Sequence, residues 1–155
     1  MIVHRIDTQH ELDPVKVREG VYALESFLRP MEQVDCPVTH VFAHHIYSRQ
    51  CFNSKGTLIV GKVQRFGCLV VLLSGEVSIL DENGVRRVTA PAVFPSEPGA
   101  KRVVYAHEDS IFMTVHENPT DEMDLDALEE YLIVPDALNC EEPDVLILKE
   151  ALCLG

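Results

Sequence analysis

The chain has 155 residues, of which 46% are hydrophobic and 25% are charged. This composition is typical of one globular domain and excludes wholesale disorder. The formal net charge is -12, with Asp and Glu concentrated after residue 117, so the chain repels phosphate backbones and we expect no nucleic-acid partner.

The first predicted element is an amphipathic helix. Asp13 and Pro14 are residues that favour the start of a helix, and apolar residues then recur at helical spacing up to Pro30. These apolar residues are Val17, Val21, Leu24 and Leu28. The stripe must cover either the open end of the barrel or the same stripe on a second copy. We assign residues 1–35 to an N-terminal helical extension.

Short strand-like segments separated by turns follow. A strand is predicted over residues 38–48, two strands within 56–75, and a hairpin of 76–80 with 85–89 across the turn residues Asn83 and Gly84. A proline-bounded edge strand at 91–95 and strands at 102–106 and 111–116 complete the set. The fold class predicted for residues 36–118 is a mainly β, single antiparallel β-barrel or jelly roll.

The pattern changes after residue 118. Leu125, Leu128 and Leu132 predict a short helix with an acidic outer face. The apolar run 145–148 predicts a further strand, paired within the chain or with a partner. Residues 119–155 are therefore interpreted as a C-terminal helix with an apolar tail.

Signals for targeting and for disulfides are missing from the sequence. It contains no signal-peptide pattern and no run of about 18 uncharged apolar residues, so we expect a cytoplasmic protein without a membrane partner. The cysteines are odd in number and form no C-x-x-C pair, which favours reduced, buried thiols over a disulfide framework or a zinc site. They are Cys36, Cys51, Cys68, Cys140 and Cys153.

Two glycines carry a family resemblance. Gly56 and Gly75 have the spacing of the first motif of the cupin superfamily (RmlC-like proteins), G-x5-H-x-H-x3,4-E-x6-G. Lys62 and Gln64 stand at the histidine positions of that motif, and Cys68 stands at the carboxylate position. The chain thus resembles a cupin in which the usual metal ligands are replaced.

The second cupin motif, G-x5-P-x-G-x2-H-x3-N, aligns over residues 91–106. Gly99 fits its inner glycine, whereas Arg102 stands at the histidine and Ala106 at the asparagine. The resemblance implies a barrel with these positions near its interior.

The chain is also similar to small stand-alone cupin-like proteins of bacteriophages and prophages. Segments 36–40, 56–61 and 101–109, together with His116, carry this resemblance, which spans roughly residues 20–135. It implies a viral protein in the host cytoplasm or in a virion. It also implies a non-enzymatic role, either in protein assembly with a protein partner or in binding a small ligand.

The residues at the motif positions suggest a metal-free pocket. Lys62, Gln64 and Arg102 are poor metal ligands but suit an anionic or polar ligand, and Cys68 is one soft donor without companions. We therefore predict these four as ligand-binding residues, with no cofactor. An interpretation without a ligand also stays open, in which Lys62 extends to solvent at the rim of the barrel and Arg102 forms an ion pair on the surface.

Two further hypotheses follow from the sequence. His40, His44, His107 and His116 form a metal site if they converge, which would define a metal-dependent cupin enzyme with relocated ligands. Separately, the predicted strand 58–63 is apolar on both faces, so something must cover its second face. We expect a homodimer or a larger homo-oligomer.

Overall fold

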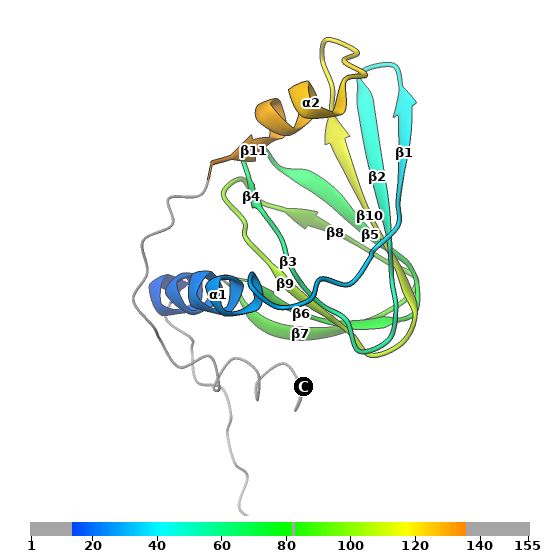
Figure 1. The fold of residues 1–155 in the computed structure, drawn as a ribbon. Coiled ribbons are helices and arrows are strands. Elements are labelled where there is room, and N and C mark those ends of the chain that lie inside the picture. Colours follow the sequence, from blue (N-terminus) through cyan, green and yellow to red (C-terminus); the bar gives the residue numbers. More distant parts are fainter. Residues whose placement is uncertain (1–13, 82, 136–155) are drawn as a thin grey trace, which may run out of the picture.

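The computed structural model describes residues 14–81 and 83–135 and contains two antiparallel sheets that face each other (Figure 1). The described residues also form two helices, one on the outside of one sheet and one across an end of the sandwich. In chain order the elements are α1 (Pro14–Leu28), β1 (Val38–Ala43), β2 (Ile46–Asn53), β3 (Leu58–Val60), β4 (Val63–Gln64), β5 (Cys68–Ser74), β6 (Glu76–Asp81), β7 (Gly84–Thr89), β8 (Ala92–Ser96), β9 (Val103–Ala106), β10 (Ser110–Glu117), α2 (Leu125–Leu132) and β11 (Ile133–Val134).

The strand order is that of a jelly roll. The five-stranded sheet has the order β1-β2-β10-β5-β8, the four-stranded sheet has the order β3-β9-β6-β7, and β4 pairs with β11. From β5 onward the chain returns repeatedly from one sheet to the other, so neighbouring strands within a sheet are mostly distant in sequence. Without the edge strand β1, the two sheets have four strands each, β2-β10-β5-β8 and β3-β9-β6-β7, and eight strands wound in this way form the two Greek keys of a jelly roll. The predicted fold class, mainly β with an N-terminal and a short C-terminal helix, is confirmed.

Helix α1 covers the outer face of the four-stranded sheet. Val17, Val21 and Leu24 are buried against Leu80 and Val103 of β6 and β9. The stripe that the sequence predicts therefore packs on its own chain (Figure 1).

The orientation expected for the third strand is wrong for its first half. In an unbroken strand, Leu58 and Val60 would share the inward face predicted for Lys62 and Gln64, but both pack against the cluster that holds α1, and Ile59 faces the interior. The strand is interrupted at Gly61, whose N–H donates to the Arg102 carbonyl at 2.8 Å. Because β3 and β4 are separated at this point, the alternation does not continue from Leu58 to Gln64.

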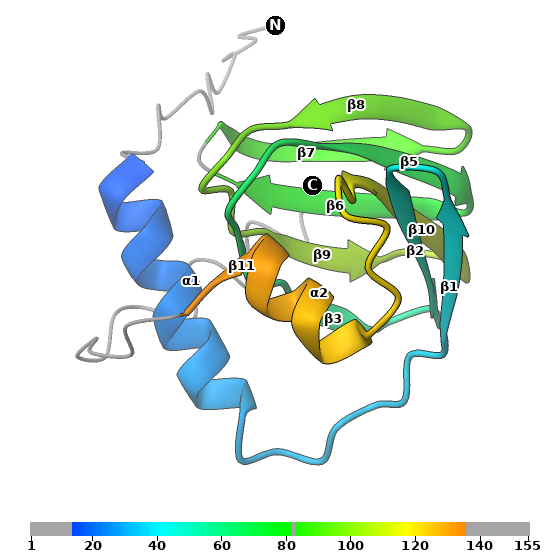
Figure 2. The ribbon, with the colours of Figure 1, turned by 90° about the horizontal axis from the view of Figure 1, so that it is seen from above.

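The space between the sheets is filled by apolar side chains over only part of its length. Leu72, Val77, Ile79 and Val104 form the buried core, with Phe112 packed against it. Towards the other end, Tyr47 packs on Leu128 and Leu132 of α2. Helix α2 thus closes that end of the sandwich (Figure 2).

The predicted helix over residues 125–132 is confirmed. Asp124 is its N-cap, and the Asp124 side chain accepts a hydrogen bond from the Ala127 N–H. Leu128 and Leu132 lie on the buried face, as their spacing indicates, whereas Leu125 is exposed. The short strand β11 follows at once and pairs with β4, so the end of α2 is tied to the barrel.

The predicted strand over residues 38–48 is wrong in one respect, because the chain turns within it. His44 and His45 form the turn between β1 and β2, and His45 has a φ of 60°. The Asp121 carboxylate accepts the His45 N–H at 2.6 Å. A residue distant in sequence therefore stabilises a turn that has none of the usual local turn residues.

Some expectations concern residues outside the described ranges. The Asp13 cap, the apolar tail 145–148, Cys140 and Cys153 lie there. The three cysteines within the described residues, Cys36, Cys51 and Cys68, are free thiols. Among the described residues, no helix has the length and apolar character needed to cross a membrane.

Candidate functional site

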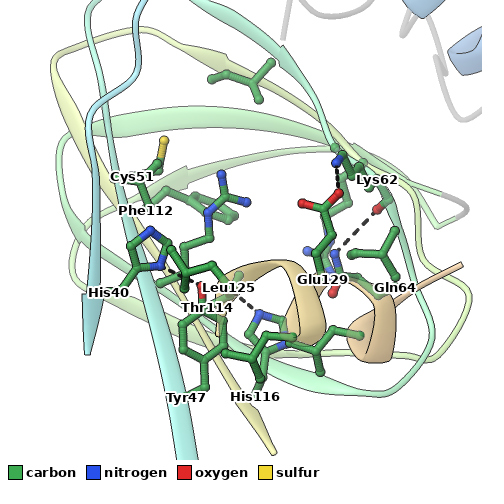
Figure 3. Close-up of a pocket in the computed structure, with 18 of the residues that line it drawn as sticks. His40, Tyr47, Cys51, Lys62, Gln64, Phe112, Thr114, His116, Leu125 and Glu129 are labelled. Carbon is green, nitrogen blue, oxygen red and sulfur yellow. Dashed lines mark hydrogen bonds and ion pairs between the residues drawn. The ribbon is translucent and has the colours of Figure 1, made fainter. Parts of the chain in front are cut away.

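A cavity of about 470 Å³ lies between the two sheets beneath α2 (Figure 3). Residues of both sheets and of α2 line it. Its polar side chains come from three places: the inner faces of β1, β2 and β10, strand β4 together with the residues just before β4 and β9, and one side of α2. They include His40, Tyr47, Arg49, Cys51, Asn53, Lys62, Gln64, Arg102, Thr114, His116, Asp126 and Glu129.

One wall of the cavity is aromatic. The ring of Tyr47 stacks with His40 and with His116, and each pair of ring centroids is 5.9 Å apart. The Tyr47 hydroxyl is hydrogen-bonded to Nδ1 of His40 at 2.8 Å. Burial raises the pKa of Tyr47, so the phenol stays protonated at neutral pH. This wall offers a flat apolar surface with polar edges.

The second imidazole of the wall, His116, is affected by the charges of two arginines. His116 is buried, and its Nε2 lies 2.8 Å from the Thr114 hydroxyl. Burial, together with the guanidinium groups of Arg49 and Arg102, lowers the pKa of His116 to about 4. His116 is therefore neutral at physiological pH, while the charge beside it is positive.

The opposite side of the cavity has a mixed charge. Lys62 forms an ion pair with Glu129 of α2 at the rim. Asp126 also lies on the lining face of α2. The cavity is thus cationic between the sheets and carries acidic side chains near the helix.

Three of the four predicted ligand-binding residues line this cavity. They are Lys62, Gln64 and Arg102. Lys62 occupies the rim, and Gln64 Nε2 donates weakly to the Lys62 carbonyl at 3.5 Å. Arg102 lies deeper, close enough to His116 to affect its pKa.

Cys68 does not line the cavity. It is buried on the inner face of β5, where burial is the main factor that raises the pKa of its thiol. The Arg102 charge and a hydrogen bond with Ser96 oppose this shift. A buried thiol with a raised pKa is a poor nucleophile and a poor metal ligand.

The four histidines of the alternative metal hypothesis lie in three separate places. His40 and His116 line the cavity, His44 lies in the exposed β1–β2 turn beside Asp121, and His107 is hydrogen-bonded to Ser78 of the four-stranded sheet. His40 and His116 are on strands β1 and β10, with β2 between them. The Tyr47 ring, on the strand between them, stacks with both imidazoles, so it occupies the space in which the two rings would have to meet at one ion.

Sequence reasoning missed two residues of the cavity wall. Tyr47 and Arg49 both project inwards from β2. The alternation of side chains along residues 46–53 is the signal that places Tyr47, Arg49 and Cys51 on one face. This alternation is not apparent when a single strand is predicted over residues 38–48, because β2 begins at Ile46 and continues to Asn53.

No protein-family model matches the chain, and no curated protein matches it. Solved structures with a similar fold do exist. They include an uncharacterized conserved protein with a double-stranded β-helix domain from Klebsiella pneumoniae, with 19% identity over 64% of this chain and 90% of that chain and a TM-score of 0.49. A cupin superfamily protein from Desulfitobacterium hafniense has 8% identity over 56% and 80% of the two chains and a TM-score of 0.48.

A third similar structure is a Cupin 2 conserved barrel domain protein from Salinispora arenicola. It has 12% identity over 76% of this chain and 89% of that chain, with a TM-score of 0.47. At these identities and TM-scores the similarity is one of general fold. The assignment of a jelly roll therefore rests on the strand order given above.

Proposed function

We propose that this protein is a cupin-like module that binds a small anionic ligand in the cavity between its sheets. One observation carries the proposal. Arg49, from the five-stranded sheet, and Arg102, which precedes β9 of the four-stranded sheet, both line the cavity together with the buried His116. Two guanidinium groups from the two sheets therefore line one cavity, in a chain whose net charge is -12.

The chemistry of the walls indicates the class of ligand. Guanidinium groups bind carboxylate and phosphate oxygens through paired hydrogen bonds. The stacked rings of His40, Tyr47 and His116 provide an apolar surface, and the acidic side of α2 suits hydroxyl or amino groups. A volume of about 470 Å³ is in the range of small-molecule sites. A hydroxylated carboxylate or a phosphate ester combines these features.

The same residues argue for binding without the usual cupin metal. At the motif positions, Lys62 is ion-paired with Glu129, Gln64 is an amide, and Cys68 lies outside the cavity lining. These groups do not form a donor set for a transition metal. We further propose a binding role rather than an enzymatic one, and the resemblance of segments such as 105–109 to phage proteins supports a phage-type context.

The test uses anions of increasing complexity with the full chain. We expect gluconate, citrate or inorganic phosphate to perturb the NMR signals of the His116 ring and to raise its pKa, whereas neutral glucose does neither. Arg49→Gln should weaken binding about tenfold or more, and Arg87→Gln is the matched control because Arg87 pairs with Glu76 away from the cavity. Binding that is unchanged in Arg49→Gln, or no binding by any of the three anions, would contradict the proposal.

Metal analysis separates this proposal from the enzyme alternative. The purified protein should hold no stoichiometric transition metal. Stoichiometric iron, manganese, nickel or zinc that disappears in His116→Ala, but remains in His107→Ala, would favour a metal-dependent protein instead. His107 is a suitable control because it bonds to Ser78, outside the cavity.

A further inference from the structure

The outer face of the five-stranded sheet is apolar. Residues that line the cavity or the core alternate along each strand with residues that point away from it. On the central strands β10 and β5 the outward residues are Ile111, Met113, Val115, Leu69, Val71 and Leu73. Leu69 and Leu73 are 50% and 45% exposed.

The flanking strands continue this surface. Phe52 of β2, Val41 of β1 and Val93 of β8 point to the same side and are 42%, 46% and 66% exposed. The polar outward residues on β2, Ser48 and Gln50, are uncharged. One acidic residue, Glu117, occurs at the end of β10, where it accepts a hydrogen bond from Tyr131 of α2.

No described element covers this face. Helix α1 packs on the four-stranded sheet, and α2 packs on Tyr47 at the end of the sandwich (Figure 2). A sheet face in contact with water normally carries polar side chains, and a large uncharged apolar surface marks an interaction site. In a chain of which 25% is charged, a face of this kind is therefore a candidate interaction site.

We propose that the partner is the same face of a second copy, so that two five-stranded sheets pack face to face in a twofold homodimer. Charge is the first argument. The chain has a net charge of -12, so two copies repel each other over most of their surface. This face has no charged residue in its interior, and repulsion between copies is smallest there.

Size is the second argument. Five strands at about 4.8 Å spacing span about 20 Å, and strands of this length extend about 20 Å in the other direction. A patch of this extent has a plane area of about 400 Å², and the relief of its protruding side chains adds to this area, so it supplies a large part of the roughly 800 Å² of accessible surface that each partner buries in a stable interface. Sheets with apolar faces pack about 10 Å apart, and a twofold axis makes one patch complementary to itself.

The segment 136–155 of the same chain is the alternative occupant. Its apolar run 145–148 is four residues long and is preceded by Glu141, Glu142 and Asp144. Four extended residues span about 13 Å, which is less than the width of the face. The second copy, by contrast, matches the face in both size and chemistry.

Light scattering of the full chain at micromolar concentration tests the proposal. We expect a mass near twice the chain mass of 17.4 kDa. Val93→Lys should raise the dimer dissociation constant about tenfold or more, because it places an unpaired charge in the interface. Lysine also reduces the negative charge of the chain, so greater overall repulsion cannot cause the dissociation.

Val34→Lys is the matched control, because Val34 is 62% exposed in the connection between α1 and β1, away from the sheet face. It should leave the dissociation constant unchanged. Gln50→Lys provides a second test. Gln50 is already a polar residue on the outer face, so we expect this variant to fold like the wild type. A mass of one chain for the wild type, or a dimer that neither Val93→Lys nor Gln50→Lys weakens, would overturn the proposal.

Discussion

Nζ of Lys101 lies 2.8 Å from Oε2 of Glu25, and the Lys101 side chain is fully buried. Glu25 belongs to α1, whereas Lys101 precedes β9 of the sheet that α1 covers. The Nζ atom is also 4.9 Å from the centre of the Tyr22 ring, a cation–π contact. A buried cation is tolerated only with such partners, so this ion pair fixes the position of α1 on the barrel.

We expect Lys101→Ala to reduce the free energy of unfolding by about 3 kcal/mol, because it leaves the Glu25 carboxylate without its buried partner. Urea denaturation measures the change. Lys62→Ala is the control, since Lys62 forms an exposed ion pair with Glu129 and such pairs contribute about 1 kcal/mol or less. Equal losses in the two variants would show that burial of Lys101 does not matter.

Gly75 and Gly84 both have a positive φ, but only one of them lacks space for a side chain. A Cβ at Gly75 would lie 2.4 Å from the Asp109 carbonyl oxygen, whereas a Cβ at Gly84 would meet nothing within 4 Å. Gly84→Ala should cost about 1–2 kcal/mol from backbone strain alone. Gly75→Ala should cost about 2 kcal/mol more, because the backbone must move. Thermal denaturation measures the stability loss in each variant. A smaller loss for Gly75→Ala than for Gly84→Ala would show that the turn at Gly75 has room for a side chain.

Local patterns were sufficient to predict most of the fold. The β6–β7 hairpin follows from the Asn-Gly turn signal, and α2 follows from the spacing of Leu125, Leu128 and Leu132. The β1–β2 turn was missed because Asp121, far along the chain, holds the His45 N–H. Contacts of this kind depend on the completed fold, so no local pattern records them.

The candidate site was predictable only in part, for the same physical reason. The glycine spacing placed Lys62, Gln64 and Arg102 near the cavity. It also placed Cys68 there, but Cys68 is buried on β5 without lining the cavity. The contribution of Arg49 depends on which face of β2 meets the other sheet, and that requires the full strand order.

Asp121 should contribute to stability through its charge. Hydrogen bonds from the His45 backbone N–H and from the His44 ring lower the pKa of Asp121. A carboxyl group with a lowered folded-state pKa stabilises the fold above its unfolded-state pKa, and this stabilisation is lost as the pH falls through the folded-state value. Asp121→Ala should lower the melting temperature at neutral pH and have a smaller effect at strongly acidic pH.

Asp121→Asn is the matched variant. Asparagine still accepts the His45 N–H, and it tolerates the positive φ of 54° at this position. Its melting temperature at neutral pH should therefore lie between those of the wild type and Asp121→Ala. Identical melting temperatures for Asp121→Ala and the wild type would show that the turn does not depend on this carboxylate.

Because of His116, the free energy of unfolding should fall as the pH is lowered from about 6.5 to about 4. Burial and the charges of Arg49 and Arg102 lower the pKa of His116 from 6.5 to about 4. In this pH window the unfolded chain binds a proton at His116 that the folded chain does not bind, so the free energy of unfolding rises with pH. A shift of this size corresponds to about 3 kcal/mol across the window.

The measurement compares urea denaturation of the wild type and of His116→Gln at several pH values in that window. Carboxyl groups titrate in both proteins, so the difference between them isolates the imidazole. We expect the stability of the wild type to fall more steeply with acid than that of His116→Gln, which keeps a hydrogen-bonding group near Thr114. If the two curves are parallel, His116 is protonated freely in the folded state. In that case the two arginines do not act on it, and the electrostatic basis of the anion site is lost.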